Sequence, residues 1–268
     1  MLELSEQFTL DAQTIAWGRM GSGPPLVAVH GTPFSAQVWR RIVPNLTHRW
    51  QVYFFYLLGY GQSAMEEGQD VSLGRQNQVM CALLDHWGLE CPDVLAHDFG
   101  GATALRAHLL DGRAYRRLTL INPVAIRPWG SPFVAHVSAH EMAFSGMPAY
   151  AHEALVEAYL KGAAHRPLSA EALEVYKAPW QGPVGQAAFY RQIAQMDQRF
   201  TDAIEPLLTP LSMPVHLMWG EQDDWIPLQQ GRTLADKLGV ELHVVPNAGH
   251  LVQEDAPEAI VAALLSMS

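Results

Sequence analysis

The chain has 268 residues, near the upper end for a single domain; 49% of its residues are hydrophobic and 16% are charged. This globular composition allows a substantial core and excludes a disordered chain. The formal net charge of −10 opposes binding to nucleic acid or to an anionic membrane, because both attract clustered Lys and Arg.

The first residues, 1–6, have neither the basic start nor the long apolar stretch of a secretion signal. No window approaches the roughly 18–20 uninterrupted apolar residues of a membrane span. We therefore expect a cytoplasmic protein with no membrane partner, present as a monomer or a homodimer.

Weak alternation of apolar and polar residues over 8–16 predicts an antiparallel hairpin near the start of the chain. Short apolar strands then alternate with helices. The strands are expected at residues 26–29, 52–55, 93–96, 118–121, 215–219 and 242–245. Helices are expected around 80–87, directly after residue 98, and from about residue 257. This order predicts an α/β fold with a mostly parallel central sheet that is covered by helices on both faces.

One long segment, residues 125–208, breaks this rhythm. It is rich in Pro, Gly, Ala, His and aromatic residues, and it contains helical patterns but no strand. We expect it to form an all-helical insertion, here called the lid, between two parts of one core, residues 1–124 and 209–268. An insertion at that point would cover the carboxyl ends of the strands, where ligands bind in such sheets.

A sharp corner is expected where the strand ending at Ala96 meets the next helix, in the sequence Ala96-His97-Asp98-Phe99-Gly100-Gly101. Small neighbours permit the tight turn that lifts Asp98 above the sheet, and the helix start favours negative charge there. The pattern matches the nucleophile elbow G-x-S-x-G, with Asp in the Ser position. The alternative is that Asp98 only caps the helix, a position at which Asp is common.

Two later loops supply an acid and a base. Asp223 follows the strand at 215–219, and His250 follows the strand at 242–245. The order nucleophile, acid, base along the chain is that of α/β hydrolases, in which the acid orients and stabilises the imidazole. Asp224 competes with Asp223 as the orienting acid, and the spacing from Gly220 favours Asp223.

With these segments in place, the sequence resembles the α/β hydrolases over nearly its whole length. The resemblance is carried by His30-Gly31-Thr32-Pro33, the corner at Asp98, Gly220-x-x-Asp223-x-x-x-Pro227 and Ala248-Gly249-His250. Within that superfamily, an aspartate at the corner preceded by His resembles the epoxide hydrolases and haloalkane dehalogenases. The resemblance implies an α/β-hydrolase fold with the lid as its helical insertion.

The product that a carboxylate nucleophile forms limits the reactions that Asp98 can start. A carboxylate that attacked an ester carbonyl would give a high-energy anhydride, whereas attack at a saturated carbon gives an ordinary ester on Asp98. His250 can then activate a water that hydrolyses this ester. The resemblance implies that backbone N–H groups of Thr32 and Phe99 form the oxyanion hole for that second step.

The resemblance also has implications for the leaving group of the substrate. Haloalkane dehalogenases usually carry Trp and Asn where this chain has Phe99 and Thr32, and the Arg of haloacetate dehalogenases is missing. Phe189-Tyr190-Arg191 resembles a lid segment of epoxide hydrolases, whose lid tyrosines protonate the opening oxygen. It implies Tyr190 as the acid, with Tyr150 second. Separately, Trp129 is expected to line the substrate cavity from the lid, with buried packing as the alternative. We expect a small apolar epoxide as substrate, with a haloalkane or haloacid as the alternative.

Two other functions use the same residues. Asp98 and His250 could act only as acid and base in a lyase or isomerase, or the fold could bind a ligand without catalysis. The remaining histidines show no set of three or four convergent ligands, so we expect no metal and no cofactor. The expected partners are a small apolar organic substrate and water.

Overall fold

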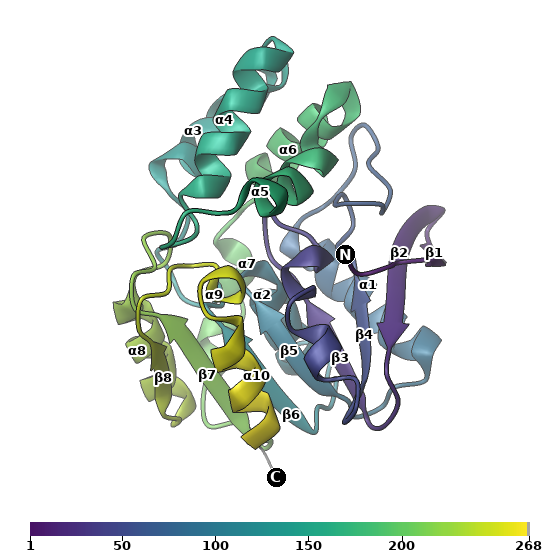
Figure 1. Cartoon of the computed structure of the whole chain (residues 1–268), viewed down its shortest axis with the longest axis vertical. Coiled ribbons are helices and arrows are strands. Elements are labelled where there is room, and N and C mark those ends of the chain that lie inside the picture. Colours follow the sequence, from purple (N-terminus) through teal and green to yellow (C-terminus); the bar gives the residue numbers. More distant parts are fainter. Residues whose placement is uncertain (267–268) are drawn as a thin grey trace.

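A central eight-stranded sheet organises the computed structural model, which describes residues 1–266 (Figure 1). The strand order is β1-β2-β4-β3-β5-β6-β7-β8. The strands are β1 Glu6–Leu10, β2 Gln13–Met20, β3 Pro25–Val29, β4 Gln51–Phe55, β5 Asp93–His97, β6 Arg117–Ile121, β7 Val215–Gly220 and β8 Leu242–Val245. The β1–β2 and β2–β4 pairs are antiparallel and the other five pairs are parallel. The prediction of a mostly parallel sheet is confirmed.

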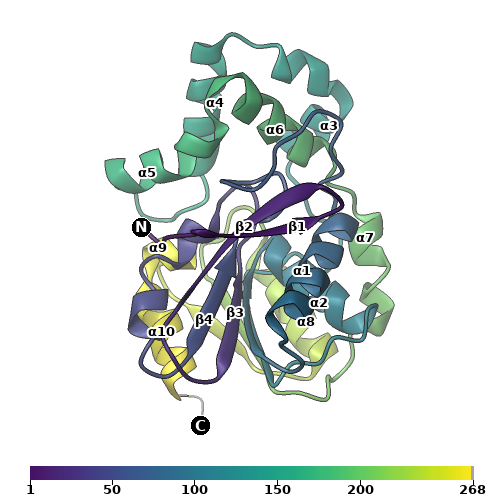
Figure 2. The same cartoon turned by 90° about the vertical axis from the view of Figure 1, so that its right-hand side faces the viewer.

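Helices cover both faces of the sheet, which explains why its central strands are apolar on both sides. Figure 2 shows α1 (Leu73–Trp87), α2 (Phe99–Leu109) and α8 (Leu228–Leu238) on one side and α10 (Pro257–Ser266) on the other. The short helices η1 (Ala36–Trp39), η2 (Val43–Asn45) and α9 (Val252–Asp255) complete the core.

The first long helix shows how local sequence sets an element's limits. The Ser72 hydroxyl accepts a hydrogen bond from the Arg75 N–H at the start of α1, and Gly88 ends the helix in the left-handed conformation with φ 66°. A serine cap and a terminal glycine are the usual signals at these two positions. The helix is therefore bounded by its own sequence.

The connection between β6 and β7 carries the lid residues and contains no strand within the part of the chain described. Its helices are α3 Pro132–Ser145, α4 Ala149–Lys161, α5 Ala170–Lys177, η3 Ala178–Trp180, α6 Gly182–Ala194, α7 Arg199–Asp202 and η4 Glu205–Leu207. Helices α3 to α6 lie above the sheet, beyond the carboxyl ends of its parallel strands (Figure 1). Within residues 1–266, no helix is both long and apolar enough to cross a membrane.

Buried polar contacts fasten the lid to the core. The Arg40 guanidinium donates to the Tyr176 hydroxyl at 2.7 Å and forms an ion pair with Glu254 at 2.5 Å, and the Tyr176 hydroxyl also donates to Glu254. Arg40 directly follows η1 and Glu254 lies in α9, both in the core, whereas Tyr176 lies in α5 of the lid. The two hydrogen bonds of the Tyr176 hydroxyl therefore join the lid to a largely buried ion pair of the core.

Candidate active site

Asp98 occupies the bend between β5 and α2. Its backbone has φ 53° and ψ −119°, a conformation that side-chain-bearing residues rarely adopt. The carboxylate makes no capping hydrogen bond to α2, so the capping alternative does not describe this residue. A Cβ at Gly100 would lie 2.4 Å from the Val29 carbonyl oxygen, which explains the glycine there.

One backbone donor is already aimed at the carboxylate. The Thr32 N–H donates to Asp98 Oδ1 at 2.7 Å. Gly31 allows this approach, because a Cβ there would lie 2.4 Å from Asp98 Oδ1. Phe99 is the first residue of α2, so its N–H belongs to the helix start that follows the carboxylate.

The side chains of Asp98, Asp223 and His250 lie together. His250 Nε2 lies 3.5 Å from Asp98 Oδ2, and His250 Nδ1 donates to Asp223 Oδ2 at 2.9 Å. All three side chains are buried. Asp224, the competing acid, is exposed, and within residues 1–266 no hydrogen bond or ion pair joins it to His250.

The Asp223 carboxylate is held by further donors. Its Oδ1 accepts the N–H groups of Trp225 and Ile226, both at 2.8 Å, and its Oδ2 accepts Asn122 Nδ2 at 2.6 Å. These three hydrogen bonds fix the position of the carboxylate beside His250. Sequence reasoning missed Asn122, although an Asn that directly follows an apolar strand at this edge of the sheet was a usable signal.

The imidazole of His250 lies between two carboxylates. Burial disfavours its charged form, but the charges and hydrogen bonds of Asp223 and Asp98 outweigh burial and raise its pKa to about 10. The resting site therefore holds an imidazolium at neutral pH. A change that removes the charge of Asp98 would lower this pKa.

Two other buried histidines support the loops of the site. His30 Nδ1 donates to the Gly31 carbonyl at 2.9 Å, and His97 Nε2 donates to the His250 carbonyl at 3.0 Å. Burial lowers the pKa of His30 to about 4, and burial together with the nearby His250 lowers that of His97 to about 3. Both rings are thus neutral and act as hydrogen-bonding supports.

A mainly apolar cavity opens above the Asp98 carboxylate. Aromatic and aliphatic side chains dominate it, and no Lys or Arg lines it. The lining residues are Thr32, Asp98, Phe99, Val124, Trp129, Gly130, Ser131, Val134, Tyr159, Met196, Trp225 and Ile226. Such a lining favours a neutral, apolar ligand over a carboxylate.

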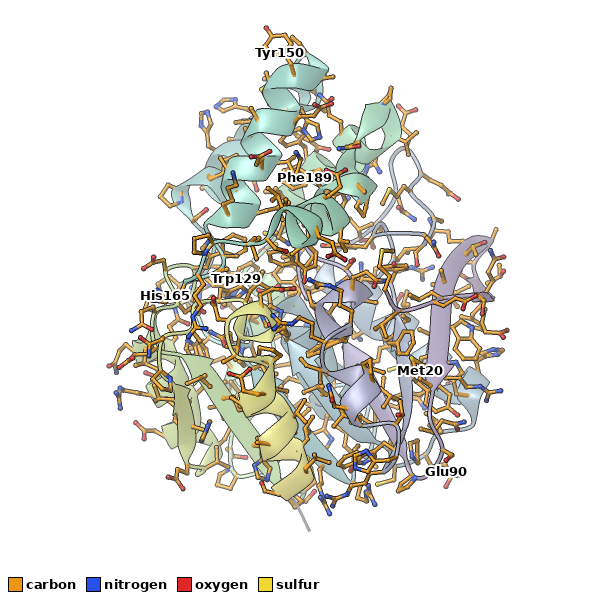
Figure 3. The ribbon with its side chains drawn as sticks, viewed as in Figure 1. Met20, Glu90, Trp129, Tyr150, His165 and Phe189 are labelled. Carbon is orange, nitrogen blue, oxygen red and sulfur yellow. The ribbon has the colours of Figure 1, made fainter. Side chains whose placement is uncertain are left out.

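The lid residues expected at the site divide into two groups. Trp129 lines the cavity, and Figure 3 shows it near the junction of lid and core. Tyr190 is buried outside the cavity, where its hydroxyl donates to His152 Nδ1 at 3.0 Å. Tyr150 is 77% exposed at the tip of the lid. The expectation that these two tyrosines face the substrate is therefore corrected, because their helices turn them elsewhere.

The tyrosine that does line the cavity is Tyr159 of α4. Its ring stacks on that of Trp225, with the ring centroids 4.7 Å apart. The Trp225 ring in turn stacks on that of His250, with the centroids 5.1 Å apart. Burial, together with the charge of Asp98, raises the pKa of this phenol, so it stays protonated. Within residues 1–266, its hydroxyl forms no hydrogen bond.

Within residues 1–266, no group of three or more His, Cys, Asp or Glu side chains is arranged so that it could hold a metal ion. The polar groups of the cavity are the ones already described.

The sheet order and the position of the inserted helices define the class of the enzyme, an α/β hydrolase. Residues 26–263 match the model of the alpha/beta hydrolase family, and the chain belongs to this family, in the branch that contains haloalkane dehalogenases.

Relatives and solved structures agree. The chain is 28% identical to haloalkane dehalogenase 2 of Mycobacterium tuberculosis, over 91% of this chain and 88% of that protein. It is 30% identical to a haloalkane dehalogenase of Mesorhizobium japonicum, over 91% of this chain and 84% of that protein. An alpha/beta hydrolase fold protein from Burkholderia ambifaria has 62% identity and a TM-score of 0.97, over 99% of this chain and 98% of that one. An epoxide hydrolase with 22% identity and a TM-score of 0.75 shares the fold, over 97% of this chain and 96% of that one.

The charge balance around His250 can be tested without a substrate. Asp98→Asn removes one of the two carboxylates that favour the imidazolium, so the pKa of His250 should fall by about 1–3 pH units. The measurement is a pH titration of the histidine ring signals by NMR, with His250→Gln to assign them. Asp224→Asn, which removes an exposed acid of the same loop, should leave the titration unchanged. An unchanged pKa in Asp98→Asn would contradict the proposed proximity.

Proposed function

We propose that this enzyme hydrolyses small, neutral, apolar substrates at a saturated carbon, through a covalent ester on Asp98. The observation that carries the proposal is the placement of one carboxylate at the floor of an apolar cavity, between a backbone donor and an imidazole. Residues 125–208 act in this proposal as the lid, which supplies half of the residues that line the cavity, Trp129 and Tyr159 among them.

The first step follows from the different contacts of the two carboxylate oxygens. Oδ1 is held by the Thr32 N–H, so Oδ2 is the oxygen left to attack carbon. A bond forms between Oδ2 and the substrate carbon while the bond to the leaving group breaks. The excluded water and the fixed carboxylate favour this displacement, because a nucleophile in an apolar cavity is less solvated.

The second step follows from the loss of charge on Asp98. Once Asp98 is an ester it no longer stabilises the imidazolium, so the pKa of His250 falls and the ring releases its proton. Neutral His250 then takes a proton from water, and the water oxygen attacks Cγ of the ester. Negative charge develops on Oδ1, which the N–H groups of Thr32 and Phe99 stabilise. Collapse restores the carboxylate, and of the two protons of water one goes to the product and the other returns to His250.

Tyr159 makes an epoxide the leading substrate. An opening epoxide oxygen needs a proton, and Tyr159 offers a phenol with no other partner in the cavity. Trp129, by contrast, already donates its indole N–H to Thr201 Oγ1 at 2.7 Å and is not free to hold a halide. The proton that His250 releases balances the one that Tyr159 gives up.

A carbon–halogen bond is the second candidate. The observation that favours it is the 28–30% identity to proteins named haloalkane dehalogenase over most of the chain. A haloacid fits less well, because no cation lines the cavity to receive its carboxylate.

Single-turnover hydrolysis in heavy-oxygen water tests the covalent step. With styrene oxide as the probe and enzyme in excess, the heavy oxygen should appear in the Asp98 peptide by mass spectrometry. His250→Gln should stop the second step, so the intact protein should gain the mass of the substrate. Turnover without label at Asp98 would instead favour an acid–base reaction, such as that of a lyase or isomerase, and would sink the covalent mechanism.

A pair of matched tyrosine variants tests the leaving group. Tyr159→Phe should lower kcat on styrene oxide by about 10²–10⁴-fold, which is the usual contribution of a general acid, and should change turnover of 1-chlorohexane by less than about threefold. Tyr190→Phe removes a buried hydroxyl outside the cavity and should leave both rates near wild type. Equal losses on both substrates in Tyr159→Phe would remove the case for an epoxide.

A further inference from the structure

Two lid side chains form hydrogen bonds with Thr32 and Pro33, the dipeptide whose first N–H donates to Asp98. Gln192 of α6 accepts hydrogen bonds at Oε1 from the Thr32 hydroxyl and, at 2.9 Å, from the Tyr60 hydroxyl. Trp180 Nε1 donates to the Pro33 carbonyl at 2.8 Å. The loop that carries the oxyanion donor is therefore held from above by the lid as well as from below by the core.

The Gln192 amide is hard to explain by folding alone. Its side chain is only 2% exposed, and within the described residues its Nε2 has no hydrogen-bond partner. A buried donor without a partner destabilises the fold, and an apolar residue of the same size would avoid this. The amide oxygen does, however, accept hydrogen bonds from two hydroxyl groups, and one of them belongs to Thr32.

The contact acts on a single residue at two points. Thr32 uses its hydroxyl to reach Gln192 and its N–H to reach Asp98 Oδ1. Fixing the hydroxyl limits rotation of Thr32, and so it keeps the N–H aimed at the oxygen on which charge develops. Preorganised donors of this kind are effective because they need no rearrangement during the reaction.

We propose that Gln192 is a positioning residue that holds the oxyanion donor of Thr32 in place for hydrolysis of the ester. The inference rests on the proposed function, and it assigns Gln192 to one of the two steps. Charge grows on Oδ1 only when water attacks the ester, whereas the first displacement removes charge from the carboxylate. Loss of Gln192 should therefore slow the second step and leave the first nearly intact.

The experiment measures both steps separately. Gln192→Leu is mixed with styrene oxide with enzyme in excess, the reaction is quenched at intervals, and the esterified protein is counted by intact mass. We expect ester hydrolysis to slow by about 10–100-fold and ester formation by less than about threefold, so that the ester accumulates. Gln192→Met, which keeps the unbranched shape, should give the same pattern if the leucine variant folds poorly.

Gln195 provides a matched control at the end of the same helix. It also ties the lid to the core, by accepting the Val71 N–H and donating to the Gln69 carbonyl, both at 2.8 Å, but it lies outside the oxyanion loop. Gln195→Leu should loosen the lid to a similar degree and leave the ratio of the two rates unchanged. Thr32→Val removes the other end of the Gln192 contact, so Thr32→Val and Gln192→Leu should be non-additive when combined.

Three outcomes would overturn the inference, and they differ in what else they overturn. Equal slowing of both steps in Gln192→Leu, or the same change of ratio in Gln195→Leu, would reject the positioning role while leaving the covalent mechanism standing. Failure to observe any ester, even in His250→Gln, would reject the proposed function together with the role of Gln192.

Discussion

The candidate active site depends on one electrostatic arrangement, a buried imidazole between two carboxylates. Burial alone would keep His250 neutral, but the charges and hydrogen bonds of Asp223 and Asp98 outweigh burial and favour the imidazolium. Each acid is then held by donors that do not move, namely the Thr32 N–H on one side and Asn122 with two loop N–H groups on the other. The unusual backbone at Asp98 persists because this surrounding network fixes the carboxylate.

The parallel sheet makes this arrangement possible. Asp98, Asn122, Asp223 and His250 follow β5, β6, β7 and β8, four neighbouring strands whose carboxyl ends meet at one edge. Four loops that are distant in sequence therefore deliver side chains to one place without any of them having to be long. Glycine at position 31 lets the loop after β3 approach the same point, which adds the Thr32 N–H, the oxyanion donor of the proposed mechanism.

The sequence predicted the parts of the site that depend on local patterns. The sheet, the corner at Asp98 and the loops of Asp223 and His250 all have short-range signals, and the structure brings these side chains together. The lid residues could not be assigned in the same way, because a motif does not fix the rotation of a helix about its axis. Tyr190 has the expected neighbours in sequence but faces His152, whereas Tyr159 has no motif and faces the cavity.

Hydrogen bonds between lid and core also fix the loop that carries His250. Asp255 accepts the N–H of Gly249, next to His250, and also those of His165 and Arg166, while the Leu251 N–H donates to the Ala163 carbonyl. The loop of His250 is thus tied to the segment after α4, just as the loop of Thr32 is tied to α6 and η3. Under the proposed mechanism, a lid bonded to both loops is a structural part of the active site. We therefore expect sequence changes in the lid to alter catalysis as well as substrate fit, even where they do not touch the cavity.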